Sequence, residues 1–203
     1  VKLQKKGYTK FNIKASSGIK FLVSNNVIED SPHAIAAFFH GHQQHLGKKR
    51  IGEYLGAAAH GDVLDQYVQL FDFDGITLDE AMRSFLLGFR LPGEAQQIDR
   101  ILEKFAGHFY QYEGNQGPFA SADTAYILAF SIIMLNTDLH NPSIRADKKM
   151  TVDQFVNNNR GINGGKDLPR EVLETLYENI KSNEIKMQDA DMAESDVVTF
   201  MAP

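Results

Sequence analysis

The feature that most constrains the fold is a helical spacing of apolar residues, repeated in one segment after another. Apolar side chains recur every three or four residues, which places them on one face of an α-helix. The stripes are Ile35, Phe38 and Phe39; Val63, Leu64, Tyr67, Val68 and Phe71; Leu78, Met82, Phe85 and Leu86; Ile98, Ile101, Leu102, Phe105 and Phe109; and Val172, Leu173, Leu176, Tyr177 and Ile180. No segment shows the period of two that is typical of strands. The sequence therefore predicts an all-α fold.

Helix-start signals accompany several of these stripes. Ser31 is a preferred N-cap residue, and Pro32 follows it at the first helical position, where proline is common. We expect Thr151 to cap a short helix that contains Phe155, and Pro169 to open the last helix. These signals place helices along most of the chain.

The most apolar stretch covers residues 125–135. It is too short to cross a bilayer, so it predicts a buried helix. Ser121 or Asp123 is positioned to cap this helix, which we expect to end near Asn141. Within it, Ile132 and Leu135 are predicted to belong to the core.

The bulk composition fits one soluble domain. The chain has 203 residues, 43% of them hydrophobic and 23% charged, which is enough chain for a substantial core. The absence of cysteine excludes a disulfide framework and a thiolate metal site, and it agrees with a reducing compartment. The first residues show no signal-peptide pattern, so we expect a cytoplasmic protein.

The net charge of −5 is unevenly distributed. Residues 1–50 contain nine Lys or Arg and two acidic residues, whereas residues 51–203 contain twelve and twenty-four. Solvated faces of different sign are one explanation. The alternative is that the basic end faces an anionic membrane while the acidic body meets a basic partner.

One segment presents a carboxylate on a turn between two helices. Pro92 can open a helix because its missing N–H would be unpaired there, and Gly93 lets another surface approach the backbone. Glu94 then lies in or just before the first turn, where the helix dipole favours an anion. Acidic residues in this position often only stabilise the helix, so the turn alone does not establish a function.

A second segment about 40 residues further on changes this interpretation. It contains Ser121-Ala122-Asp123-Thr124-Ala125-Tyr126 and continues to Met134-Leu135-Asn136-Thr137-Asp138-Leu139-His140-Asn141-Pro142. Together the two segments resemble the Sec-seven domain, the catalytic module of exchange factors for Arf-family small GTPases. Further matching motifs are Phe11-Asn12-Ile13-Lys14, Ile51-Gly52-Glu53-Tyr54-Leu55-Gly56, Phe71-Asp72-Phe73, Asn159-Arg160-Gly161-Ile162-Asn163, Asp167-Leu168-Pro169 and Ile185.

The resemblance implies a fold and a domain layout. It implies a right-handed stack of about ten helices with a hydrophobic surface groove. The domain would cover residues 11–185, preceded by a basic flank at residues 1–10 and followed by an acidic tail or linker at residues 186–203.

The resemblance also implies the roles of particular residues. Glu94 would be the glutamate finger that enters the nucleotide site of the GTPase near the β-phosphate and Mg²⁺. The groove would bind the GTPase through the side chains that match the family's contact positions. These are Phe130, Ile133 and Met134, with Asn141 at the edge, Asp99 as a charge partner on the finger helix, and Arg90 beside the finger.

Four positions correspond to those that set sensitivity to the inhibitor brefeldin A in this family. Sensitive members carry a Tyr-Ser pair, an Asp and a Met, and this chain carries Phe130, Ser131, Asp138 and Met150. Three of the four agree, so we expect weak inhibition. The chain also departs from many members at Gln97, where they carry lysine.

Other chemistries fit the sequence less well. His40, His42 and His45 do not share one helical face, and the residues after Asp72 lack the glycine and glutamate spacing of a calcium loop. Glu94 and Asp99 project about 140° apart on a helix, so they cannot flank one bond as a hydrolase pair.

The sequence thus predicts a guanine-nucleotide exchange factor that performs no covalent chemistry and needs no cofactor or metal. Its expected partners are an Arf-family GTPase, GDP-bound or nucleotide-free, and an anionic membrane surface, with no nucleic acid. The expected location is peripheral, at Golgi or endosomal membranes. The alternative is a helical GTPase-binding scaffold without exchange activity.

Overall fold

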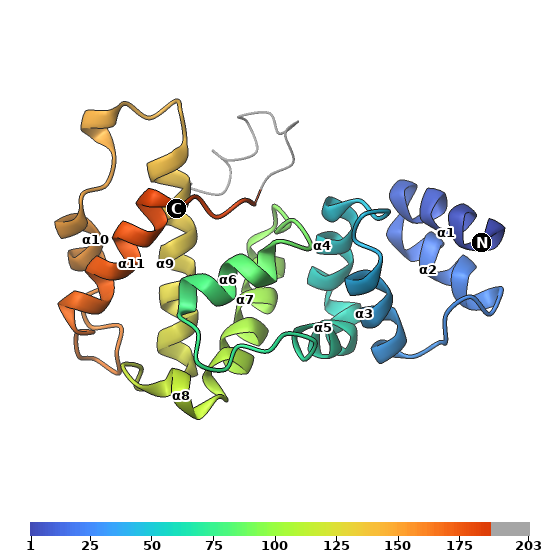
Figure 1. The fold of residues 1–203 in the computed structure, drawn as a ribbon, viewed down its shortest axis with the longest axis horizontal. Helices are drawn as coiled ribbons and strands as arrows, with labels where there is room; N and C mark the ends of the chain where they lie inside the picture. Colours follow the sequence, from blue (N-terminus) through green and yellow to red (C-terminus); the bar gives the residue numbers. More distant parts are fainter. Residues whose placement is uncertain (188–203) are drawn as a thin grey trace. The chain divides into compact units, whose positions relative to one another are not determined.

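The computed structural model describes residues 1–187, which form helices joined by short loops (Figure 1). The α-helices are α1 (Lys2–Ile13), α2 (Ala15–Ser24), α3 (Pro32–Gly41), α4 (Lys48–Gly56), α5 (Gly61–Val68), α6 (Leu78–Leu86), α7 (Ala95–Tyr110), α8 (Glu113–Gln116), α9 (Ala122–His140), α10 (Val152–Asn158) and α11 (Arg170–Ser182). Two short 3₁₀ turns, η1 (Ala58–His60) and η2 (Ala146–Lys148), complete the list. No strand occurs within residues 1–187, so the predicted all-α class is confirmed.

The helices group into two compact units. The first contains residues 1–72 and 84–104, and the second contains residues 73–83 and 105–186. Helices α6 and α7 are each divided between the two units. The predicted acidic tail at residues 186–203 lies almost entirely outside the described residues.

In the first unit, α1 packs directly on α2. A Cβ atom on Gly7 would lie 2.2 Å from a methyl carbon of Leu22, and one on Gly18 would lie 2.4 Å from the Cα of Phe11. Leu22 and Phe11 are fully buried. The predicted boundary at residue 11 therefore does not separate a flank from the fold, because Gly7 is part of this close helix contact.

Two predicted helix caps are present. The Ser31 hydroxyl accepts a hydrogen bond from the Ala34 amide at the start of α3. Thr151 and Gln154 form a reciprocal capping box at the start of α10. Ser121 occupies the N-cap position of α9, but its side chain makes no capping hydrogen bond.

In the second unit, the long helix α9 packs against α11. Leu128, Ile132 and Leu135 of α9 are fully buried, so the predicted core role of the last two is confirmed.

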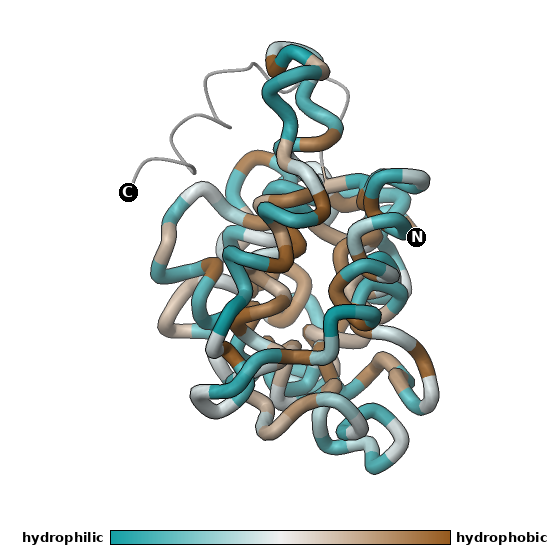
Figure 2. The backbone as a smooth tube through the Cα atoms, turned by 90° about the vertical axis from the view of Figure 1, so that its left-hand side faces the viewer, coloured by the Kyte–Doolittle hydropathy of each residue, from teal (hydrophilic) through white to brown (hydrophobic). Residues whose placement is uncertain are grey.

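Hydrophobic and hydrophilic residues alternate along the helical turns of the chain in Figure 2. Among the described helices, none combines the length and apolar character that a membrane span requires.

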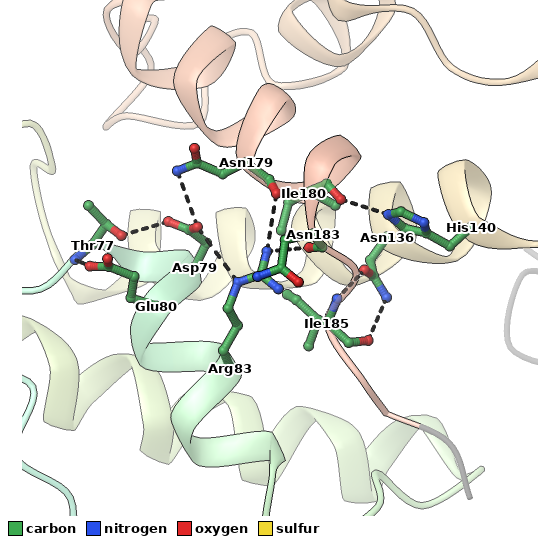
Figure 3. A network of polar contacts seen from close by, with 10 residues as sticks. All are labelled: Thr77, Asp79, Glu80, Arg83, Asn136, His140, Asn179, Ile180, Asn183 and Ile185. Carbon is green, nitrogen blue, oxygen red and sulfur yellow. Dashed lines mark hydrogen bonds and ion pairs between the residues drawn. The ribbon is translucent and has the colours of Figure 1, made fainter. Parts of the chain in front are cut away.

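Side chains from α6 and α9 hold the carboxyl end of α11 (Figure 3). Arg83 of α6 donates to the carbonyls of Asn179 and Asn183, the first at 3.3 Å and the second at 2.5 Å. His140 lies 2.6 Å from the carbonyl of Ile180. The carbonyl of Ile180 lies in the last turn of α11, where a helix leaves carbonyl groups without an intrahelical partner. The carbonyl of Asn179 also accepts a hydrogen bond from the Asn183 amide at 3.0 Å.

Asn136 makes a two-way contact with the chain beyond α11. Its amide donates to the carbonyl of Ile185 at 3.1 Å, and its oxygen accepts from the Ile185 N–H at 2.8 Å. Asn136 is 3% exposed and Ile185 is 1% exposed. The pair therefore replaces two backbone hydrogen bonds in a place that water does not reach.

We expect Asn136→Ala to destabilise the fold by about 2–3 kcal/mol, because it leaves both backbone groups of Ile185 buried without partners. Urea unfolding followed by circular dichroism measures this loss. Thr137→Ala, at a half-buried neighbour whose hydroxyl bonds only to its own helix, is the matched control. Equal small losses in both variants would contradict a structural role for the Asn136 side chain.

Candidate functional site

The finger helix begins three residues later than the proline suggested. Helix α7 starts at Ala95, so Pro92 and Gly93 form an irregular turn and Glu94 occupies the position directly before the helix. The carbonyl of Glu94 accepts hydrogen bonds from the amides of Gln97 at 3.0 Å and Ile98 at 3.1 Å. The prediction that Pro92 opens the helix is therefore wrong, while the placement of Glu94 just before the first turn is confirmed.

The Glu94 side chain is exposed to solvent. Its carboxylate accepts one hydrogen bond, from the side-chain amide of Gln97 at 3.3 Å. Within residues 1–187, no Lys, Arg or His forms an ion pair with it. The carboxylate is thus held by a neutral partner and keeps its full charge for an approaching molecule.

Helix α4 supports the segment that carries Glu94. A Cβ atom on Gly52 would lie 1.7 Å from the carbonyl oxygen of Arg90, and one on Gly56 would lie 2.9 Å from the Cβ of Gln97 and 3.2 Å from Pro92. Gly52 and Gly56 are one helical turn apart, so they lie on the same face. The missing side chains let residues 90–97 pack directly against the helix.

Hydrogen bonds and an aromatic contact fix this segment further. The Arg90 amide donates to the carbonyl of Lys48 at 3.1 Å, and Arg100 donates to the carbonyl of Gly56 at 2.5 Å. Phe89 is 1% exposed and its ring lies 5.0 Å from that of Phe85. These contacts anchor the segment on both sides of Glu94.

The other two residues predicted beside the finger differ in exposure. Asp99 is exposed on the second turn of α7, whereas Arg90 is half-buried. The backbone of Arg90 takes part in the contact with α4 described above. These contacts involve the backbone of Arg90, so a role for its side chain stays a prediction.

Two aromatic side chains and one methionine form a partly exposed stripe on α9. Tyr126, Phe130 and Met134 are spaced by four residues, and the rings of the first two lie 5.9 Å apart. Met134 is 44% exposed, and Tyr126 and Phe130 are half-buried. We call these three residues the α9 stripe.

Ile133 is not part of this exposed surface. Only 2% of it is accessible, so the structure places it in the core, contrary to the prediction of a groove contact. Around the helix it lies about 60° from Phe130, which made it a candidate. Neighbouring side chains cover that side of α9, and spacing alone does not reveal them.

The residues after α9 form a tight set of contacts. Asn141 ends the helix, and its side-chain oxygen accepts from the Ser143 amide at 2.9 Å. Asp138 accepts from the amide of Met150 at 2.6 Å, so two of the four inhibitor-related positions touch each other. Ser131, like Phe130, is half-buried on α9.

The three histidines weighed as a metal site, His40, His42 and His45, make packing contacts, and the ring of His40 lies 5.3 Å from that of Phe71. His42 lies 3.1 Å from the Gln4 amide, and the His45 ring stacks on Tyr8 at 4.9 Å. Among the described residues, no group of three or more His, Asp or Glu side chains is arranged to hold a metal ion.

This chain belongs to the Sec7 domain family, whose model matches residues 2–185. The match takes in helix α1, in agreement with its packing on α2.

Among its relatives is the brefeldin A-inhibited guanine nucleotide-exchange protein 3 of Arabidopsis thaliana. It is 54% identical over 185 residues, which cover 90% of this chain and 10% of that protein. The chain therefore spans about a tenth of the length of this relative, and the same holds for the brefeldin A-inhibited guanine nucleotide-exchange protein 2 of Arabidopsis thaliana.

Solved structures of the family share the fold. One shows ARF1-GDP bound to a Sec7 domain complexed with brefeldin A; it has a TM-score of 0.84 and 41% identity, covering 92% of this chain and 93% of that chain. The Sec7p catalytic domain has a TM-score of 0.81 and 42% identity, covering 89% of this chain and 94% of that chain.

Proposed function

We propose that the chain is a guanine-nucleotide exchange domain that promotes GDP release from an Arf-family GTPase. The observation that carries the proposal is the exposed Glu94 carboxylate, which has no cationic partner within residues 1–187 and stands on a backbone anchored against α4. Membership of the Sec7 family, together with a relative that is named as an exchange protein, supports this assignment.

In this proposal Glu94 weakens nucleotide binding by electrostatic competition. A GTPase holds its nucleotide mainly through phosphate contacts to a lysine, backbone amides and Mg²⁺. A carboxylate placed there repels the β-phosphate, competes for the lysine and disfavours the metal position. At 4 Å, two unit charges interact by about 4 kcal/mol at an effective dielectric constant near 20, which corresponds to roughly a thousandfold in rate. No covalent bond changes.

The rigid backbone matters for this mechanism. A flexible carboxylate would turn away from the phosphate and lose the repulsion. The packing of residues 90–97 on Gly52 and Gly56 limits that escape. The side-chain amide of Gln97 donates one hydrogen bond at 3.3 Å to the Glu94 carboxylate and does not cancel its charge.

The energy that holds the GTPase must come from a separate contact surface, and the α9 stripe is our candidate. Met134 and Phe130 offer apolar contact area, and Tyr126 extends the same face by one turn. Asn141 supplies a hydrogen-bonding group at the end of α9, and Asp99 supplies a negative charge on α7.

A scaffold that binds the GTPase without exchange is the alternative. Such a protein would use the α9 stripe but would not need an anchored anion at Glu94. The expected setting in either case is the cytoplasmic face of Golgi or endosomal membranes, where the chain would act as a peripheral protein.

We expect Met134→Ala to weaken GTPase binding by at least tenfold and to change the free energy of unfolding by less than about 1 kcal/mol. An exposed interface anchor loses affinity on truncation without creating an internal cavity. Leu135→Ala is the matched control, since its fully buried side chain should cost about 2–5 kcal/mol. A large stability loss from Met134→Ala with unchanged binding would show that this side chain stabilises the fold and does not contact the GTPase.

Brefeldin A should inhibit the domain weakly, and Phe130→Tyr should strengthen inhibition about two- to tenfold. The tyrosine would add one hydroxyl, whose hydrogen bond typically contributes about 0.5–1.5 kcal/mol. Inhibition of stimulated GDP release, titrated for both proteins, measures the effect. Complete indifference of both proteins to the drug would remove Phe130 from the proposed contact surface.

A further inference from the structure

Helix α1 carries a row of lysines with an exposed isoleucine among them. Lys2, Lys6 and Lys10 are spaced by four residues, and at 100° per residue they share an arc of about 80° with Ile13. Ile13 is 71% exposed, and Lys2 and Lys6 are exposed as well. We call these four residues the lysine face. The buried residues of α1, Gly7 and Phe11, point elsewhere, toward α2.

An aromatic ring on the neighbouring helix holds two of the lysines. The ammonium nitrogen of Lys6 lies 5.6 Å from the ring centroid of Phe21, and that of Lys10 lies 5.4 Å from it. Both charges are therefore kept on one side of α1 by cation–π attraction. The arrangement places positive charges close together without relying on a carboxylate.

The fold does not neutralise these charges. Within residues 1–187, the ion pairs include none of the three lysines of this face. Like charges four residues apart destabilise a helix. An external anion would relieve this repulsion.

We propose that the lysine face docks on an anionic lipid bilayer, with phosphatidylserine-type headgroups against the lysines and Ile13 entering the interface. Clustered lysines near a membrane gain attraction from its negative surface potential. The chain as a whole carries a net charge of −5, so general attraction to an anionic surface does not account for such docking.

Apolar exposure favours a bilayer over a nucleic acid. Ile13 and Leu3, which is 46% exposed, flank the lysines with aliphatic groups. Aliphatic side chains gain free energy in the interfacial region of a membrane, whereas single-stranded nucleic acids are bound on exposed aromatic rings. The proposal rests on the proposed exchange function only for its biological setting, a membrane-bound GTPase.

Vesicle co-sedimentation of the 203-residue chain tests the proposal. We expect binding to phosphatidylcholine vesicles that contain about 30% phosphatidylserine, and loss of binding when the salt is raised from about 0.15 M to 1 M. The triple variant K2Q/K6Q/K10Q should bind about 100-fold more weakly, and Ile13→Gln several-fold more weakly. K148Q/K166Q/K186Q removes the same charge from exposed positions of the second unit and should bind within twofold of the parent.

Four results would overturn the proposal. They are equal sedimentation with pure phosphatidylcholine, equal weakening by the control triple, tighter binding of duplex DNA that the lysine triple abolishes, and saturable binding of inositol hexakisphosphate in place of vesicles. GDP release from a soluble, non-acylated Arf protein is measured in parallel. We expect K2Q/K6Q/K10Q to retain it, so failure of vesicle binding and failure of exchange are separate outcomes.

Discussion

Glu94→Lys should abolish stimulated GDP release, with a loss of at least about a thousandfold, while the protein stays folded. The side chain is exposed and makes one weak hydrogen bond to Gln97, so its replacement leaves the packing unchanged. A lysine at this position would attract the phosphates that a carboxylate repels. We therefore expect a stalled complex with the GTPase that still contains GDP.

The matched control lies on α7, the helix that follows Glu94. Glu103→Lys makes the same charge change at an exposed residue of α7, nine positions from Glu94, and should leave exchange within a few-fold of the parent. Gel filtration with nucleotide analysis detects the stalled complex, and circular dichroism verifies the fold. Normal exchange by Glu94→Lys, or an equal loss in both variants, would contradict the finger mechanism.

Gly52→Ala should have the largest effect on stability, lowering the free energy of unfolding by at least about 3 kcal/mol. The added methyl group would lie 1.7 Å from the carbonyl oxygen of Arg90, and a backbone atom cannot move aside as a flexible side chain does. For a domain of this size, the expected drop in melting temperature is about 6–12 °C.

Gly107→Ala provides the control for that experiment. Gly107 also lies within a helix, and nothing lies within 4 Å of an added Cβ, so alanine should raise stability by up to about 1 kcal/mol. The folded fraction of Gly52→Ala should also lose exchange activity, since Arg90 leads directly into the turn that carries Glu94. Equal melting temperatures for the two variants would show that α4 and the finger segment are not in close contact.

Local signals in the sequence were sufficient for α3, α5, α6, α7, α9, α10 and α11 and for several of their ends, but they did not predict α1, α2, α4 or α8. The caps at Ser31 and Thr151 depend on residues within one turn, and both are present as predicted. The start of α7 depends on more than the local signal of Pro92. That proline packs near Gly56, a distant residue in the sequence, while Glu94 takes the position before the helix.

The candidate site was only partly predictable for the same reason. Glu94 and Met134 were identified from their motifs, and both are exposed. The burial of Ile133 depends on side chains from other elements, so its position on α9 did not reveal it.

The support for the finger was missed, although it had a visible signal. Gly52 and Gly56 stand four residues apart in a helical segment, a spacing that indicates close approach of another backbone. The role of Asn136 had no such signal, because its partner, Ile185, lies 49 residues away.

The central claim is that this domain accelerates nucleotide release from Arf-family GTPases. The most direct measurement is the release of fluorescent GDP from a panel of purified Arf proteins, and from one small GTPase outside that family, at increasing concentrations of the 203-residue chain. We predict a concentration-dependent rise in the release rate for at least one Arf protein and no change for the outside GTPase. Release rates that stay at their spontaneous values across the whole Arf panel would contradict the account.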